Sequence, residues 1–543
     1  MFNSSVILIR SLVLAVLLLT LPLSAFSERP NILWIDIDDQ SPWYNVYGDK
    51  TVSTPNLDAL ANEGVVFERV YVANPICGPS RSAMITGVYP IRAGTHDMRA
   101  GRVPEYQIHL PEEITTVPEI MRKAGYETYN AHKDDYNFAY DRHDLYSFGN
   151  PPHPYSPGSR DDEAGKGGGK KGGGKEVSKK QLMEMGFTAE KAAEMLAQLD
   201  KDKSKGKNAV NYKGLRGSGS WRDVKEGPFF GQMSIPGGKS VDTINEQLRS
   251  FGLEPVDPAD VRVPAQYPNI PQVRQHVADH YNSVQRTDHK VGELVQQFKE
   301  EGLWGNTVFI LYSDHGSDLP RSKGYVYKEG LHVPFIIAAP GMDIIEPGRR
   351  SDLVNLMDIA ATTLALGGVE VPEFMDAEDV FAKDYHREYI YSSSDRWGNV
   401  IDRTRSVMGE RFHYIRNFKR DRPLFNWGSY EMVSKMRDPD GKTTSFMAMR
   451  RMADAGELKG AQMAPYGKRV AEELYDLKND PDEVNNLAAD PAYKEQLTKM
   501  RKALLYWIAD TDDKGQYPRS AGAMQEITDR FPPDWLKSAE FLK

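Results

Sequence analysis

Short apolar runs that alternate with helical patterns constrain this chain more than any other feature of its sequence. Asn31–Ile37 (NILWIDI) reads as a buried strand, and so does 306–313 (NTVFILYS). Near-continuous apolar runs of this length are typical of strands covered on both faces. The pattern predicts an α/β fold with a mostly parallel central sheet and helices on both faces.

The alternation continues through the first two thirds of the chain. The predicted strands are 65–72, 126–131, 228–235 and 332–339, and the predicted helices are 54–64, 79–86, 116–124, Pro271–Glu300 and 352–366. Pro55 and Pro79 suit the first position of a helix, while Gly64 and Gly87 suit the position just after its end. The strand ends are where we expect functional side chains.

The pattern changes near residue 380. Short strands with tight connections are predicted over 388–394, 403–408 and 411–417, followed by a terminal helix over 493–509. We therefore expect a large domain over 28–380 that carries the functional residues, and a smaller α+β domain over 381–543.

The N-terminus reads as a signal peptide over residues 1–27. An apolar run over 11–23 follows Arg10, and small residues precede Glu28. A membrane anchor is the alternative, but the run is short and no second apolar stretch of about 20 residues follows. The sequence predicts a secreted or periplasmic protein without stable membrane insertion after cleavage.

A segment over 158–208 differs in composition from its surroundings. It contains GKGGGKKGGGK, which cannot bury a core, so we expect a flexible Lys/Gly-rich insertion. Docking onto a polyanion is the alternative function for it. The net charge of the whole chain is −9, which argues against a nucleic-acid partner.

Cys77 is the only cysteine, so a chain with an export signal has no internal disulfide. A buried structural thiol is the simplest alternative, but Gly78, Pro79, Ser80 and Arg81 make a poor apolar lining. The helix predicted after Cys77 places free N–H groups there, which favour an anion.

Acidic residues follow two of the predicted strands. Asp38 and Asp39 end the first strand, and Asp314 and His315 end the strand over 306–313. Carboxylates at one sheet edge suit a hard divalent cation, with His315 adding a nitrogen. Each pair alone would better suit an exposed loop with helix-capping acids, but the shared location of the two pairs after buried strands favours a metal site. Arg81, Lys133 and Lys323 add the positive charge that a tetrahedral oxyanion needs.

These residues resemble the sulfatase family, within the alkaline phosphatase-like superfamily. Cys77-Gly-Pro-Ser-Arg81 with Thr86-Gly87 matches the signature Cys-x-Pro-Ser-Arg. Further matches are Arg29-Pro-Asn-Ile-Leu leading to Asp38-Asp39, Thr54-Pro-Asn-Leu-Asp58, Ser313-Asp-His-Gly316, the block 323–334, and Glu473-Leu-Tyr-Asp-Leu through Asn486-Leu487. The resemblance spans nearly the whole mature chain except the insertion, and includes heparan N-sulfatase-like members.

The resemblance implies that a maturation enzyme oxidises Cys77 to Cα-formylglycine, whose hydrate attacks sulfur and then expels sulfate. A plain serine lacks the second hydroxyl that this cycle needs. It also implies a calcium ion held by Asp38, Asp39, Asp314, His315 and an oxygen at position 77. Arg81 would hold the nucleophile, and Lys133 and Lys323 would bind sulfate, with Lys323 near the leaving group.

Two departures from the family pattern leave the general acid open. The chain has His132-Lys133-Asp134 where many members have Gly-Lys-Trp-His, and Pro236-Gly-Gly-Lys239 where a Pro-His pair is usual. Lys239, His96 and His132 are the candidates for the proton donor.

The sequence therefore predicts a sulfatase that hydrolyses sulfate esters or sulfamates, with a sulfated carbohydrate as the favoured substrate. A phosphate or phosphonate ester hydrolase of the same superfamily is the alternative, since sulfate and phosphate share tetrahedral shape. A non-catalytic binder of sulfated glycans is a third hypothesis. Turnover of paired sulfate and phosphate esters distinguishes the three.

Overall fold

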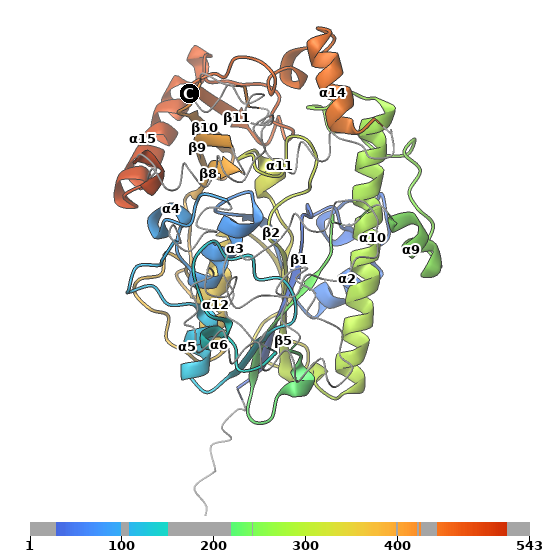
Figure 1. Ribbon diagram of the computed structural model, residues 1–543, viewed down its shortest axis with the longest axis vertical. Coiled ribbons are helices and arrows are strands. Elements are labelled where there is room, and N and C mark those ends of the chain that lie inside the picture. The colour runs from blue at the N-terminus through green and yellow to red at the C-terminus, as the bar shows by residue number, and fades with distance from the viewer. Residues whose placement is uncertain are drawn as a thin grey trace, which may run out of the picture.

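The computed structural model describes residues 29–98, 108–149, 219–239, 241, 243–397, 400–420, 423–424 and 443–517. The predicted signal peptide and the predicted insertion over 158–208 lie outside these residues. The described strands form two sheets, and the helices pack around these sheets (Figure 1). Among the described helices, none combines the length and apolar character needed to span a bilayer.

The central sheet has seven strands in the order β3-β4-β1-β5-β6-β2-β7. Their bounds are β1 Asn31–Ile37, β2 Gly64–Tyr71, β3 Glu127–Asn130, β4 Phe229–Ile235, β5 Thr307–Ser313, β6 Phe335–Ala338 and β7 Gly348–Asn355. β1 pairs in parallel with β4 and β5, whereas β6 runs antiparallel to β5 and β2. The predicted mostly parallel sheet is confirmed, with β6 as its antiparallel strand.

Helices cover both faces of this sheet (Figure 1). On one side lie α3 (Cys77–Thr86), α5 (Val117–Lys123) and α12 (Ile359–Leu366), and on the other lie α2 (Pro55–Asn62), α9 (Ile244–Ser250) and α10 (Pro271–Glu300). The side chains of β1 point alternately to the two faces of the sheet, so each face has an apolar core that helices can cover. Ile32 and Trp34 pack with residues of α3 and α12, while Leu33 and Ile35 pack with residues of α2 and α10.

A second sheet of four antiparallel strands lies toward the C-terminus, at the top of Figure 1. It has the order β11-β10-β9-β8, with bounds β8 Ile390–Trp397, β9 Val400–Met408, β10 Phe412–Asn417 and β11 Glu472–Asp476. The helix α15 (Lys494–Asp510) packs on β9 and β10 of this sheet, whereas α14 (Ser445–Asp454) packs on α10. Val407 and Tyr414 join the same core as Ile310 of β5, so the two sheets are packed together.

Three predicted elements differ from the structure. α3 begins at Cys77 rather than at Pro79, because a proline without an N–H is tolerated anywhere in the first helical turn. The segment predicted as one helix over 352–366 begins as the end of β7, and only Ile359–Leu366 is α-helical. Gly64 starts β2 instead of ending α2; a Cβ there would lie 2.0 Å from the Ile337 carbonyl oxygen.

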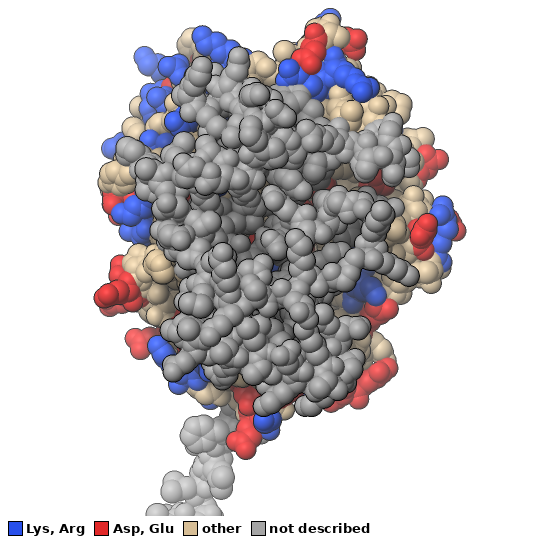
Figure 2. All heavy atoms as spheres, in the orientation of Figure 1, with Lys and Arg blue, Asp and Glu red and all other residues tan. Residues whose placement is uncertain are grey.

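Shorter helices complete the described fold. They are η1 Asn45–Tyr47, α4 Pro90–Ala93, α6 Arg142–Leu145, η3 Trp221–Asp223, η4 Trp304–Asn306, α11 Lys328–Leu331, η5 Leu356–Asp358, η6 Gly460–Gln462, η7 Pro491–Tyr493 and η8 Lys514–Gln516. Around the margin of the face in Figure 2, both basic and acidic side chains are visible, and basic ones gather at the upper left.

Candidate active site

The acidic strand ends meet at one edge of the central sheet. β1 and β5 are parallel neighbours, with Ile37 opposite Ser313, so the residues that follow each strand emerge together. The Asp39 N–H donates to Asp314 Oδ1 at 3.1 Å, and His315 Nε2 lies 3.1 Å from Asp39 Oδ1. Asp38, Asp39, Asp314 and His315 are all buried. The positive φ of Asp39 (55°) marks a sharp turn after β1.

Cys77 faces this edge from the first residue of α3. Its side chain is buried, and its Sγ lies 3.1 Å from His315 Nε2 and 3.9 Å from Asp39 Oδ1. Lys239 Nζ, from the loop after β4, lies 3.7 Å from the same sulfur. The structure therefore brings Cys77, Lys239 and the predicted metal residues into one group.

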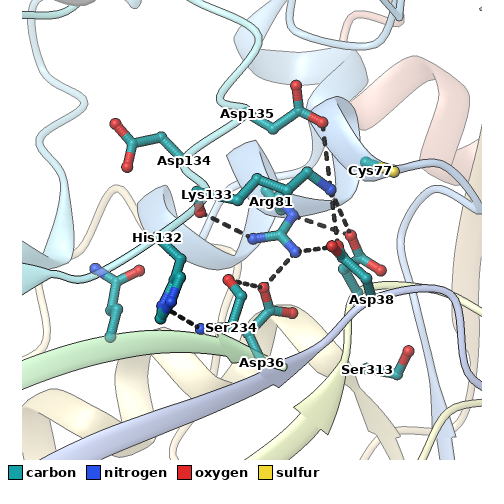
Figure 3. Close-up of polar contacts among 12 residues, drawn as sticks. Asp36, Asp38, Cys77, Arg81, His132, Lys133, Asp134, Asp135, Ser234 and Ser313 are labelled. Carbon is teal, nitrogen blue, oxygen red and sulfur yellow. Dashed lines mark hydrogen bonds and ion pairs between the residues drawn. The ribbon is translucent and has the colours of Figure 1, made fainter. Parts of the chain in front are cut away.

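Arg81 lies one helical turn after Cys77 and contacts the acids that follow both strands. Its Nε donates to Asp314 Oδ2 at 2.9 Å. Its Nη2 donates to Asp38 Oδ1 at 2.7 Å (Figure 3). The same Nη2 forms an ion pair with Asp36, and Nη1 donates to the Lys133 carbonyl at 3.2 Å. This forked contact fixes the helix against the sheet edge.

Three lysines surround the carboxylates. Lys133 Nζ lies 2.8 Å from Asp38 Oδ1 (Figure 3), and Lys323 Nζ lies 2.7 Å from Asp39 Oδ2. Lys239 Nζ lies 3.1 Å from Asp38 Oδ1 and 3.2 Å from Asp39 Oδ1. The Lys239 side chain is 30% exposed, against 6% for Lys133 and 4% for Lys323, so Lys239 is the lysine of the three that meets solvent.

The electrostatics of the group follow from burial opposed by charge. Burial alone would raise the pKa of Asp38 and of Asp39, but the neighbouring lysines hold both pKa values well below the usual range. Burial would also raise the pKa of the Cys77 thiol, yet Lys133, Lys239 and Lys323 lower it. The position of the Cys77 side chain therefore favours a negative charge.

The donor atoms have the spacing of a metal site. One ligand atom each from Asp39, Cys77, Asp314 and His315 lies within 4.8 Å of the others. Ligands at 2.3–2.6 Å around one Ca²⁺ would stand at most about 5 Å apart, so these residues fit a single divalent ion. Asp38 lies beside this group, where its Oδ1 contacts Arg81, Lys133 and Lys239.

The two histidine candidates for the general acid lie differently. His96 Nε2 is 4.0 Å from Asp97 Oδ1, and its Nδ1 is buried without a hydrogen-bond partner among the described residues. His132 Nδ1 accepts from the Ser234 N–H of β4 at 3.4 Å (Figure 3). Of the three candidates, Lys239 is the one whose described contacts reach Cys77.

Two further acids contact the candidate site residues and were not predicted. Asp36 pairs with Arg81 and accepts from Ser234 Oγ at 3.2 Å, and burial raises the pKa of Asp36 to about 7 although Arg81 opposes this. Asp135 Oδ2 lies 3.5 Å from Lys133 Nζ. Asp36 stands two residues before Asp38, and residues two apart on a strand point to the same face, so this signal was present in the sequence.

Comparison with known proteins identifies the family. A sequence model described as Sulfatase matches residues 30–369. An ulvan-active sulfatase of Formosa agariphila is 29% identical over 512 residues, which covers 91% of this chain and 77% of that protein. Human N-sulphoglucosamine sulphohydrolase is 23% identical, over 91% of this chain and 93% of that protein.

A solved structure of a 2-O GAG sulfatase shares the fold. It has a TM-score of 0.56 at 18% identity and covers 91% of this chain and 94% of its own. The segment that the family model matches, residues 30–369, contains Cys77, Arg81, the three lysines and both acidic strand ends. Because the family model covers more than half of the chain, this chain belongs to the sulfatase family and is a sulfuric ester hydrolase.

Proposed function

We propose that this chain is an exported sulfatase that removes sulfate from a carbohydrate, using a formylglycine made from Cys77 and a bound calcium ion. The observation that carries the proposal is the placement of Cys77 Sγ. It lies at the start of α3, 3.1 Å from His315 and 3.7 Å from Lys239, beside the acids that fit a metal. A thiol used only for packing would not need these neighbours.

The surroundings of Cys77 fit the oxidised side chain. Hydration of a formylglycine here would supply an oxygen nucleophile with a second hydroxyl on the same carbon. Lys239 and His315 are within reach to hydrogen-bond an oxygen at the position of Sγ. Arg81 keeps α3 in register with the acids, which fixes where that oxygen stands.

The metal residues fit calcium by their chemistry. Asp39, Asp314 and the neighbouring Asp38 offer carboxylate oxygens, the donors that Ca²⁺ prefers, and His315 adds one nitrogen. A divalent ion bound there would supply positive charge next to the nucleophile and to the sulfuryl oxygens. Lys323 and Lys133 contact the same carboxylates, so they stand beside any ion held by them.

The lysines are placed to bind the sulfuryl group. Lys133, Lys239 and Lys323 converge on Asp38 and Asp39, next to Cys77, and their positive charge would stabilise the charge that develops on the transferring oxygens. The side chain of Lys239 is the most exposed of the three, as expected of a group on the side where the substrate enters and leaves. We assign Lys239 as the candidate proton donor to the leaving group.

The relatives point to the substrate class. One is named for activity on ulvan and another for N-sulphoglucosamine, both sulfated saccharides, and each matches this chain over about nine tenths of its length. The N-terminal sequence pattern supports export, which would bring the enzyme to such polymers. We therefore favour a sulfated carbohydrate over a small aryl sulfate.

The test is a screen of defined sulfated saccharides for released sulfate, with calcium present and then chelated, using enzyme made in a host that matures the cysteine. O-sulfated and N-sulfated sugars are tested in parallel, with the matching phosphate and phosphonate esters. Sulfate release that stops on chelation supports the proposal. Faster turnover of the phosphorus esters would replace it with the phosphohydrolase alternative, and tight binding without turnover would favour a glycan binder.

A further inference from the structure

The loop that carries Lys239 is held from behind by a buried arginine of α10. Arg286 is 2% exposed, and its Nη2 donates to the carbonyl oxygens of Gly237 and Lys239 at 2.6 and 2.5 Å. Its Nη1 donates to Oε1 of Gln247 on α9 at 3.2 Å. One rigid guanidinium therefore fixes two carbonyls of the loop and connects the loop to two helices.

The loop itself is a tight turn against the acidic end of β1. The Lys239 N–H donates to the Pro236 carbonyl at 2.9 Å, which closes a four-residue turn. Gly237 has φ +52°, in the left-handed region that glycine adopts without strain. The Gly238 N–H donates to the Asp38 carbonyl at 2.8 Å, so turn and strand end are joined through the backbone.

The contact is so close that neither glycine has room for a side chain. A Cβ on Gly237 would lie 2.0 Å from the Asp38 carbonyl oxygen, and a Cβ on Gly238 would lie 2.3 Å from the Asp39 carbonyl oxygen. Both clashes are with backbone, which cannot rotate away as a flexible side chain would. The base of Lys239 is thereby set against the two aspartates that its ammonium contacts.

We propose that Arg286 is a positioning residue that acts through Lys239. By holding the carbonyls of Gly237 and Lys239, it keeps the ammonium 3.7 Å from Cys77 Sγ. The lysine side chain carries its ammonium on a flexible stem of four carbons. A small movement of the Lys239 backbone therefore lets the ammonium leave this position. The inference rests on the proposed function, in which Lys239 serves the leaving group. It adds a residue of α10 whose described hydrogen bonds go to Gly237, Lys239 and Gln247.

A double-mutant cycle tests the coupling. Arg286→Gln, Lys239→Ala and the double variant are assayed for kcat and KM on a sulfated saccharide and on nitrophenyl sulfate, which has the better leaving group. We expect Arg286→Gln to lower kcat on the saccharide about 10-fold with little change in KM, and to act more weakly on nitrophenyl sulfate. In the Lys239→Ala background, Arg286→Gln should change kcat less than about twofold.

Two further variants guard against a simple loss of folding. Arg286→Lys keeps a donor and should recover part of the loss, and Gly238→Ala should mimic Arg286→Gln because its Cβ pushes the turn off Asp39. Arg274→Gln is the matched control. Arg274 also lies on α10 and donates to the carbonyls of Pro258, Ala259 and Val261 at 3.0–3.1 Å, so its loss should leave the leaving-group dependence unchanged.

A crystal structure of Arg286→Gln gives a readout that does not depend on activity. The proposal predicts that Lys239 Nζ moves away from position 77 by more than about 1 Å, enough to impair a catalytic contact. An unmoved Lys239, or an equal loss of kcat with and without Lys239, would overturn the proposal. If the wild-type enzyme hydrolyses no sulfate ester, the proposed function fails, while the position of Lys239 in the variant still decides the role of Arg286.

Discussion

Arg81 and Asp314 are joined by a hydrogen bond of 2.9 Å from Nε to Oδ2, which links helix α3 to the end of β5. The same guanidinium reaches Asp38, which follows β1, so a single side chain connects α3 to both acidic strand ends. The planar guanidinium makes this connection with N–H groups held in fixed directions, whereas a lysine ammonium is a compact charge at the end of a flexible stem.

Arg81→Lys should therefore lower kcat by about 100-fold or more, since the nucleophile loses its fixed place and buried carboxylates lose partners. Steady-state kinetics on a sulfated substrate and thermal unfolding measure the two effects. Arg92→Lys is the control. Arg92 lies in the next helix, α4, and forms ion pairs with Asp376 and Asp510, so its replacement should leave kcat nearly unchanged. Equal losses in both variants would argue against a special role for Arg81.

Removal of the metal should lower both activity and stability. Ligand binding to the folded state alone adds about 2.7 kcal/mol at a hundred times Kd, so added calcium should raise the Tm of chelator-treated enzyme. In Asp39→Asn the calcium-dependent rise in Tm should shrink or disappear, because the candidate metal ligands then lack one carboxylate. Asp260→Asn, at an exposed turn, should keep the full rise. A Tm that ignores calcium in the wild-type enzyme would contradict the metal assignment.

Lys239 and His96 should separate in their response to the leaving group. Lys239→Ala should lower kcat by about 10²-fold for a sugar sulfate and much less for nitrophenyl sulfate, because a proton donor matters most for a poor leaving group. His96→Ala should lower both to a similar, small extent, since the described contact of His96 is with Asp97. A leaving-group dependence that follows His96 instead would reassign the proton donor.

A second prediction about stability concerns Asp513 and its two arginines. Asp513 accepts from Arg405 Nη2 at 2.7 Å through Oδ1 and from Arg403 Nη2 at 2.9 Å through Oδ2. Burial opposes ionisation of this carboxyl, but the arginines lower its pKa from 3.8 to about 2. Because the folded-state pKa is depressed, this stabilisation is fully present above pH 4 and is lost as pH falls from 4 to 2.

Asp513→Asn should accordingly be less stable than wild type by about 2–3 kcal/mol at pH 7. The difference should narrow as the pH is lowered toward 2. Denaturant unfolding of both proteins at several pH values measures it. If the difference in the free energy of unfolding between the two proteins stayed constant across this pH range, the ion pairs of Asp513 would not be the cause of that difference.

Local sequence patterns predicted much of the fold because the buried strands are strongly apolar. β1 and α10 have the predicted bounds, since the first is a near-continuous apolar run and the second opens with Pro271 and keeps one apolar face. β7 was missed because its first residues, Gly348–Arg350, are polar and largely exposed. An exposed strand at a sheet edge lacks the apolar alternation that marks a strand.

The sequence predicted which candidate residues lie together where motif residues follow strands, and it did so less well where tertiary contacts decide. Cys77 and Arg81 lie together as expected, and Asp314 meets them because β5 is the neighbour of β1. The nearness of Lys239 to Cys77 depends on a turn held by Arg286, 47 residues later in the chain, and no local pattern encodes that contact. His96 follows α3 closely in sequence, yet its described contact is with Asp97, whereas the Lys239 ammonium lies beside the sulfur.

The most direct test of the account is mass spectrometry of the peptide containing position 77, on the same preparations that are assayed for sulfate release. The account predicts that activity rises in proportion to the fraction of Cys77 converted to formylglycine, and that Cys77→Ser is inactive in sustained turnover. Full turnover from protein whose Cys77 is entirely an unmodified thiol would contradict it.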